Sequence, residues 1–182
     1  MAATFEFEAD HGTQTGSPTK GTTRTASVTD INWKNSDVHS DVYSTYPISD
    51  GNNSYEIWLF GKFTGTFNQI SAGLFAHTAG AFGTGIVLKG PPACTGDGDR
   101  LLYTTPAVIA NTALTTNMTS AISIGSGVAV FFGATGPEAT GKAAAMTTNP
   151  CYTNYLATQL QTSGAVAGDT TQVTCTLQYN EN

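Results

Sequence analysis

Residues 54–63 read Ser-Tyr-Glu-Ile-Trp-Leu-Phe-Gly-Lys-Phe, the densest aromatic stretch of the chain. Aromatic and β-branched side chains favour extended backbone, and this run has the length of a buried strand. The Asp-Gly-Asn-Asn sequence at 50–53 before it and Gly65 after it are typical of turns. The stretch therefore predicts a central strand of a β-sheet.

Alternation of apolar and polar residues extends this pattern along the chain. Phe5 and Phe7 alternate with Glu6 and Glu8, which is typical of a strand with one buried face. Further short strands are expected at 25–33, 37–46, 66–70, 73–76, 84–89, 100–105, 107–110, 120–124, 127–132, 151–161 and 170–179. No convincing amphipathic helix pattern accompanies these strands.

About ten short strands separated by turn residues predict an all-β fold, specifically an antiparallel β-sandwich that is jelly-roll-like. An immunoglobulin-like sandwich is the second choice, because the sequence lacks paired cysteines around a tryptophan. We expect residues 1–182 to form a single domain. Residues 9–24 are mostly small and polar, so we expect an extended N-terminal loop or arm that becomes ordered only against a neighbouring subunit.

The charge balance limits the classes of partner. The 182 residues include 7 Lys+Arg and 13 Asp+Glu, which gives a formal net charge of −6. Such a chain lacks the basic surface that binds nucleic acid or an anionic membrane. Its start does not resemble a signal peptide, and no apolar run has the length of a membrane span. We therefore expect synthesis in a cytoplasm, with Cys94, Cys151 and Cys175 as reduced, buried thiols.

Candidate catalytic residues are few. The histidines are His11, His39 and His77, and no Gly-x-Ser-x-Gly motif accompanies them. Among the carboxylates, Glu56 and Glu6 lie within apolar strand sequence, where buried catalytic acids usually lie. A pair of acids brought together in space stays open, as glycoside hydrolysis would need. We do not expect an enzyme or a bound cofactor.

Asp37, His39 and Asp41 alternate, so a strand over 37–46 would place all three on one face. Such a row could ligate a metal, or it could form a solvated face or a charged edge that blocks unwanted strand pairing. The second interpretation is favoured and no metal is expected. We keep these three residues, together with Trp33, as candidate interface residues.

Exposed aromatic side chains would support a sugar-binding function. Trp33 lies between Asn32 and Lys34, which makes it the best candidate for an exposed anchor. The other aromatic residues considered for a stacking platform are Trp58, Tyr43, Tyr46, Tyr55 and Tyr103. Aromatic side chains at alternating strand positions are more often part of a core, and Trp58 is expected to lie in the core or in an interface whichever way its strand faces.

The run NSYEIWLFGKFTGTFNQI at 53–70 resembles a segment of tailed-bacteriophage virion proteins, and so do the residues at 155–162, 167–170 and 174–181. Among such proteins the chain is most similar to capsid decoration (cement) proteins. This resemblance implies a jelly-roll-like subunit that forms a homotrimer and binds the major capsid protein of a tailed phage. It also implies a place on the capsid surface after synthesis in the host cytoplasm, and no catalytic residues.

Three hypotheses for function follow. The favoured one is a structural virion protein that binds and stabilises an assembled capsid. The alternative is a carbohydrate- or receptor-binding β-sandwich module of a phage tail or baseplate, since tail proteins share the same style of sequence. A hydrolase is the third.

Overall fold

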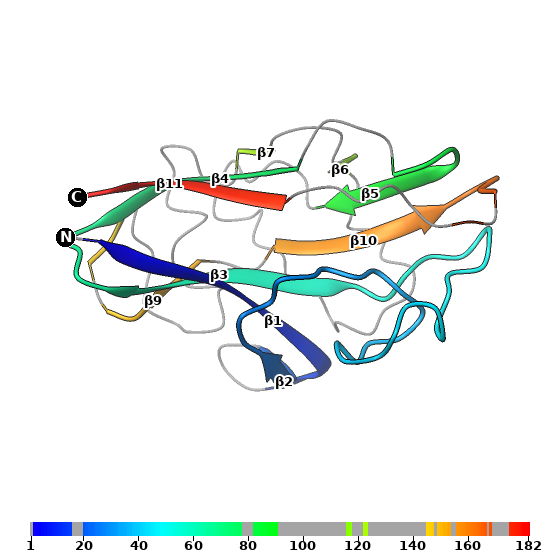
Figure 1. Ribbon diagram of the computed structural model, residues 1–182, viewed down its shortest axis with the longest axis horizontal. Helices are drawn as coiled ribbons and strands as arrows, with labels where there is room; N and C mark the ends of the chain where they lie inside the picture. Colours follow the sequence, from blue (N-terminus) through cyan, green and yellow to red (C-terminus); the bar gives the residue numbers. More distant parts are fainter. Residues whose placement is uncertain are drawn as a thin grey trace.

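The computed structural model describes residues 2–15, 20–77, 82–90, 116–117, 122–123, 145–147, 149–153, 156–166, 168 and 175–182. In these ranges the regular structure consists of β-strands, with no helix (Figure 1). Every strand pair is antiparallel. The described part therefore agrees with the predicted all-β class.

The strands belong to two sheets. Their bounds are β1 (Ala3–Thr15), β2 (Lys20–Thr25), β3 (Ile57–Gly65), β4 (Ile70–His77), β5 (Ile86–Gly90), β6 (Thr116–Asn117), β7 (Ile122–Ser123), β8 (Ala145–Met146), β9 (Cys151–Tyr152), β10 (Leu156–Thr162) and β11 (Cys175–Glu181). The larger sheet has the order β2-β1-β3-β10-β5-β6, with β9 also paired to β3. The smaller sheet has the order β11-β4-β7, with β8 also paired to β4.

The ladder between β1 and β3 follows directly from the sequence pattern. Its register pairs Phe5 with Phe63 and Glu6 with Lys62. Because successive side chains point to opposite faces of a strand, the aromatic pair and the charged pair lie on different faces. With β1 on one side and β10 and β9 on the other, β3 is the central strand that the aromatic stretch predicts.

Gly65 ends β3 at a position that requires glycine. Its φ is +98°, and a Cβ atom there would lie 2.8 Å from the backbone oxygen of Ala2. Other residues rarely adopt this φ, and a real Cβ would collide with the start of β1. The predicted turn at Gly65 is therefore confirmed, and it fixes how closely the N-terminus approaches β3.

Both faces of β3 are covered. The main core consists of Ala9, Val28, Leu59, Phe63, Ile70, Phe82, Leu88, Cys151 and Leu160. Trp58 and Phe60 are equally buried but alternate with Leu59, so they lie on the other face of the strand. Burial on both faces explains why the sequence of β3 is almost continuously apolar.

Cys151 is a free thiol within this core, as predicted. Burial raises the pKa of the Cys151 thiol to about 11, so it stays un-ionised and acts as a small apolar side chain. Cys94 and the side chain of Cys175 lie outside the described part of the chain.

Aromatic contacts join the two sheets at the end where both termini lie (Figure 1). The ring of Tyr179 in β11 lies 4.7 Å from that of Phe63 and 6.1 Å from that of Phe5, centroid to centroid. The backbone N–H of Ala3 donates to the carboxylate of Glu181 at 3.0 Å. The last strand is therefore packed against the first.

The strands predicted at 25–33 and 37–46 are wrong. Only Thr25 belongs to a strand, and residues 26–56, all of which the structure describes, contain turns and irregular backbone. The chain hydrogen-bonds to itself locally, for example from Asp41 N to Val38 O at 3.1 Å. Ser, Asp and Asn side chains compete for backbone hydrogen bonds, and this segment is rich in them.

The strand predicted at 66–70 is also wrong, since residues 66–69 form bends and irregular backbone and only Ile70 belongs to β4. The remaining predicted strands agree with the structure where it describes them. β4 and β5 overlap the predictions at 73–76 and 84–89, and β11 overlaps that at 170–179. The prediction at 151–161 corresponds to β9 and β10, and β7 falls within 120–124. The strands predicted at 100–105, 107–110 and 127–132 lie outside the described residues.

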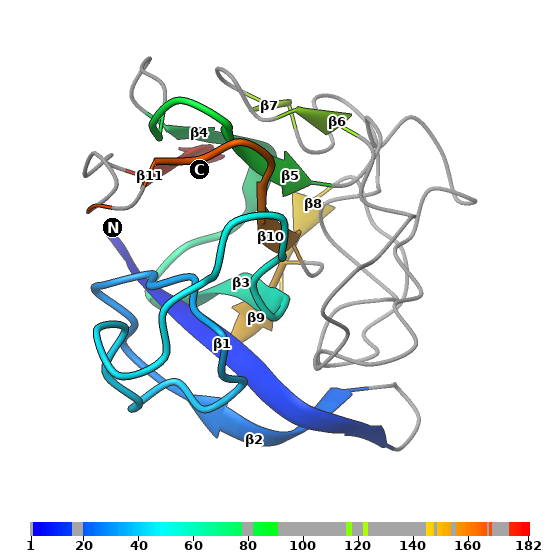
Figure 2. The same cartoon turned by 90° about the vertical axis from the view of Figure 1, so that its right-hand side faces the viewer.

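Residues 9–24, predicted to be a loop or an extended arm, belong to a β-hairpin in their described parts. β1 pairs with β2 through contacts such as Asp10 opposite Arg24, and the register shifts at a bulge between His11 and Gln14. Figure 2 shows β1 and β2 side by side along one side of the molecule. Ordering of this segment against a neighbouring subunit stays a prediction.

Candidate functional site

A compact loop between β2 and β3 is the most distinctive feature of the described surface. The N–H of Asn35 donates to the carbonyl of Tyr46 at 2.9 Å, so the two ends of the segment meet. Next to this closure, Tyr55 N donates to Lys34 O at 3.0 Å. A segment whose ends meet and whose own side chains pack inside it is an Ω loop. We call residues 35–46 the Ω loop.

Polar contacts hold the interior of the Ω loop. The hydroxyl of Ser36 donates to the carboxylate of Asp41 and accepts the backbone N–H of Val38 at 3.2 Å. The ammonium group of Lys34 donates to the backbone carbonyl of His39 at 3.1 Å. The contacts involve the charged groups of Asp41 and Lys34, and they fix the shape of the loop.

A single carboxylate joins the Ω loop to β1. The backbone N–H of Gly12 donates to Oδ2 of Asp37 at 2.6 Å. Gly12 has a φ of +84° and lies within the bulge of β1. A bulge interrupts the ladder and leaves backbone groups without strand partners, and here Asp37 supplies the acceptor.

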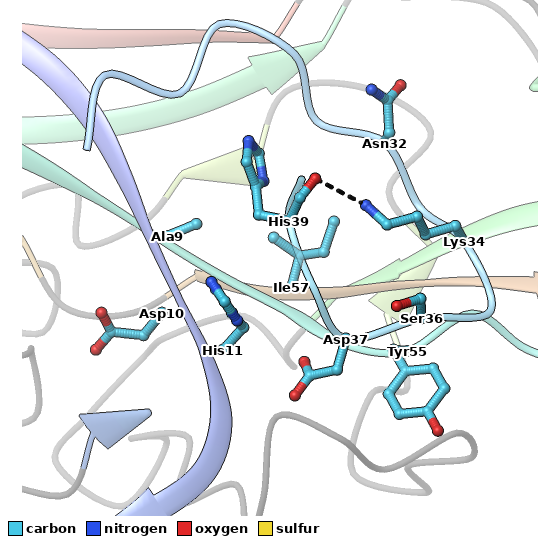
Figure 3. Close-up of a pocket in the computed structure, with 10 residues that line it drawn as sticks. All are labelled: Ala9, Asp10, His11, Asn32, Lys34, Ser36, Asp37, His39, Tyr55 and Ile57. Carbon is cyan, nitrogen blue, oxygen red and sulfur yellow. Dashed lines mark hydrogen bonds between the residues drawn. The ribbon is translucent and has the colours of Figure 1, made fainter. Parts of the chain in front are cut away.

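A small pocket lies between β1 and the Ω loop (Figure 3). It is lined by Ala9–His11 of β1, by side chains between Asn32 and His39, and by Tyr55 and Ile57. Figure 3 shows His11 on the side of Asp37, whereas the side chain of Asp10 points to the other side of β1. The pocket has room for about one water molecule, too little for an organic substrate.

Burial controls the charges in this pocket. Lys34 is only 4% exposed, and loss of hydration lowers its pKa. Burial raises the pKa of Asp37, whose Oδ1 is buried without a hydrogen-bond partner among the described residues. Burial also lowers the pKa of His39, and the positive charges of Lys34 and His11 lower it further.

The Ω loop exposes four large hydrophobic side chains. Val38, Val42, Tyr43 and Tyr46 are between 41% and 57% exposed, and we call them the apolar tip. The fifth large exposed hydrophobic side chain in the described part is Val166, on a different loop. Loops normally present polar residues to water, and exposed apolar groups often mark interaction sites.

The structure corrects the geometry of the predicted interface residues. Asp37, His39 and Asp41 do not share a strand face: Asp37 and His39 line the pocket, whereas Asp41 binds Ser36. Among the described residues, no three His, Cys, Asp or Glu side chains are placed to hold a metal ion. His77, the third histidine, has no described side chain.

Trp33 is not the exposed anchor that its sequence neighbours predict. Its indole Nε1 donates to Oγ1 of Thr158 at 3.0 Å, and its ring lies edge-on to Phe82 at 5.8 Å. Trp33 therefore packs against the core. Of the other aromatic candidates, Trp58 is buried as expected, Tyr43 and Tyr46 belong to the apolar tip, and Tyr103 lies outside the described residues.

The two carboxylates considered as catalytic candidates, Glu56 and Glu6, hydrogen-bond to neighbouring side chains. Glu56 is buried and accepts a hydrogen bond from Nε1 of Trp58 at 2.9 Å. Glu6 accepts from Nζ of Lys62 at 2.8 Å and from the hydroxyl of Ser27 at 2.6 Å. Each carboxylate thus contributes to packing around β1 and β3.

Sequence reasoning missed the burial of Glu8 and Asp10. They are 3% and 1% exposed, although alternation with Phe7 and Ala9 suggests a solvated face. Arg24 lies 2.9 Å from Asp10 and 3.7 Å from Glu8, and its guanidinium also stacks over Phe60 at 4.9 Å. The available signal was the pair of basic residues Arg24 and Lys62. The register places Arg24 opposite Asp10, and Lys62, which lies opposite Glu6, reaches Glu8 at 3.1 Å.

Comparisons with known proteins identify no relatives: no family model, curated protein or solved structure matches the chain. In the ranges that the structure describes, no helix is long and apolar enough to cross a membrane.

Proposed function

We propose that this chain is a non-catalytic structural protein of a tailed-phage virion, a decoration protein that binds and stabilises the assembled capsid. The observation that carries the proposal is the apolar tip, which is displayed on a loop whose shape is already fixed by Ser36, Lys34 and Asp37. A loop ordered before binding loses little conformational entropy on association. The resemblance of residues 53–70 to virion proteins supports the capsid as the partner.

The proposed fold is a jelly-roll-like β-sandwich. Two antiparallel sheets and the ring contacts of Tyr179 with Phe5 and Phe63 support it, because facing sheets bury their inner side chains against one another.

The proposed partners are the major capsid protein of a tailed phage and further copies of this chain in a homotrimer. β2 is the last strand in the order of the larger sheet, so its outer edge offers backbone groups for pairing with another chain. The net charge of −6 favours protein partners over nucleic acid. The proposed location is the capsid surface, after synthesis in the host cytoplasm.

Capsid binding can be tested with a matched pair of valine variants. Purified protein is sedimented with assembled capsids of the phage that encodes it, and separately with free capsid subunits. We expect binding to assembled capsids only. Val42→Ser in the apolar tip should weaken this binding, whereas Val166→Ser, at an exposed valine of another loop, should not. Equal affinity of the two variants for assembled capsids would contradict the proposal. A density map of the phage particle that shows only a few copies of this chain, at the tail, would also contradict it.

Carbohydrate binding is the second candidate function, and the exposure of Tyr43 and Tyr46 favours it. Sugar rings stack on exposed aromatic faces, and these two side chains are 51% and 41% exposed. A glycan array with the wild-type chain and with Tyr43→Ala tests it. Binding of a glycan that the variant loses, while Val166→Ser keeps it, would favour this function over capsid decoration.

A further inference from the structure

We propose that the pocket of His11, Lys34, Asp37 and His39 is an acid-sensitive switch, which holds the Ω loop against β1 at neutral pH and loosens it when His39 takes up a proton. The inference goes beyond capsid binding and does not depend on it, because it concerns the isolated protein.

The contacts that hold the Ω loop are polar and are concentrated in this pocket. Asp37 accepts the Gly12 N–H at 2.6 Å, and Lys34 donates to the His39 carbonyl at 3.1 Å. The large apolar side chains of the loop are exposed. A change of charge inside the pocket therefore acts on the contacts that fix the loop.

Positive charge would accumulate around His39 in acid. Lys34 and His11 oppose its protonation, whereas Asp30, in the segment before the Ω loop, favours it. The remaining acidic groups near the pocket are Asp37 and Asp41 of the loop itself and Asp10, whose side chain points to the other side of β1. Tyr55 also lines the pocket. A protonated His39 would place its charge in the same small space as the ammonium group of Lys34.

The direction of the effect follows from proton linkage. Burial, Lys34 and His11 lower the pKa of His39 below its ordinary value of 6.5. The closed loop therefore binds this proton less readily than an open loop does. The closed state is fully favoured above pH 6.5 and loses stability as the pH falls from 6.5 toward the lowered pKa.

Asp37 acts with the opposite sign. Burial raises the pKa of its carboxyl above the ordinary value of 3.8, so the closed loop binds this proton more readily than the open one. Protonation of Asp37 thus favours closure. Protonation of His39 should therefore open the Ω loop, whereas protonation of Asp37 should favour its closure.

The Gly12 amide reports on the switch directly. Hydrogen exchange of the ¹⁵N-labelled full chain is measured by NMR at pH 7.5 and 5.5, with correction for the intrinsic pH dependence of exchange. We expect the protection factor of the Gly12 amide to fall several-fold at pH 5.5, while the amides of β3 keep theirs. An unchanged Gly12 protection factor in the wild-type chain would overturn the proposal without the use of any variant.

Two histidine variants assign the proton. His39→Gln keeps the backbone carbonyl that Lys34 binds, so the loop should stay closed at both pH values. His11→Gln removes the other imidazole of the pocket and should retain a decrease in protection at pH 5.5. If the protection factor of the Gly12 amide falls as much in His39→Gln as in the wild-type chain, His39 is not the switch. The same conclusion follows if only His11→Gln abolishes the fall.

Discussion

The carboxylate of Asp37 accepts the backbone N–H of Gly12 at 2.6 Å, across 25 positions of sequence. This contact joins the Ω loop to the bulge of β1, where the positive φ of Gly12 interrupts the strand ladder. The side chain of Asp37 therefore contributes to the position of the Ω loop relative to the sheet.

Removal of this acceptor should destabilise the protein. We expect Asp37→Ala to lower the free energy of unfolding by about 1–3 kcal/mol, the cost of leaving a buried donor unsatisfied. Asp37→Asn keeps an acceptor oxygen and removes a charge whose burial raises the pKa of the carboxyl, so its loss should be smaller. Urea unfolding at pH 7 measures both. Equal losses would show that the charge matters rather than the acceptor.

The ion pairs of Lys62 should affect acid stability. Its hydrogen bond is the main cause that lowers the pKa of Glu6 below the ordinary 4.5. A lowered pKa in the folded state stabilises the fold above pH 4.5, and this contribution is lost as the pH falls through the lowered pKa. We expect Lys62→Met to raise the pKa of Glu6, which NMR titration of its carboxyl carbon would show. An unchanged pKa would contradict the role of Lys62.

The same variant should also lower stability at neutral pH, because Glu8 loses a partner. The Glu8 side chain is 4% exposed, so we expect a loss of about 1.5–3 kcal/mol from this charged hydrogen bond. Glu6→Gln is the control: its side chain is 30% exposed, and we expect a loss below about 1 kcal/mol.

The hydrogen bond between Trp33 and Thr158 should appear in a double-mutant cycle. Trp33→Phe removes the donor and should cost about 1–2 kcal/mol, since Thr158 is only 2% exposed. Thr158→Val removes the acceptor, and the two losses should not add in the double variant. Strict additivity in denaturant unfolding would argue against the bond. If Trp33→Phe weakens ligand binding but leaves the free energy of unfolding unchanged, Trp33 is an exposed anchor after all.

Two glycine variants separate conformational strain from steric collision. Gly51 and Gly65 both have a positive φ, at +77° and +98°, but only Gly65 has backbone within reach of an added Cβ. We expect Gly51→Ala to cost about 1 kcal/mol, the conformational penalty alone. Gly65→Ala should cost clearly more, because the oxygen of Ala2 lies 2.8 Å from that Cβ. Equal thermal shifts in the two variants would show that the start of β1 moves away freely.

Strong local patterns made part of this fold predictable. The aromatic density of residues 54–63 indicated the central strand, and alternation of Phe5 and Phe7 with glutamates indicated a strand at the N-terminus. That these two strands pair with each other was seen only in the structure. The hairpin of β1 and β2 was missed, because Thr-rich, polar sequence does not alternate between apolar and polar residues. The apparent alternation over 37–46 was misleading, since Ser36 and Asp41 hydrogen-bond within a loop.

The sequence by itself determined the all-β character of the described part, the burial of Trp58 and the turn at Gly65, because each depends on residues adjacent in the chain. Only the tertiary structure decided that Asp37 would meet Gly12, that Trp33 would turn inward and that Asp10 would be buried beside Arg24. A period of two assigns a side chain to a face of a strand, but whether that face meets water depends on distant segments packed against it.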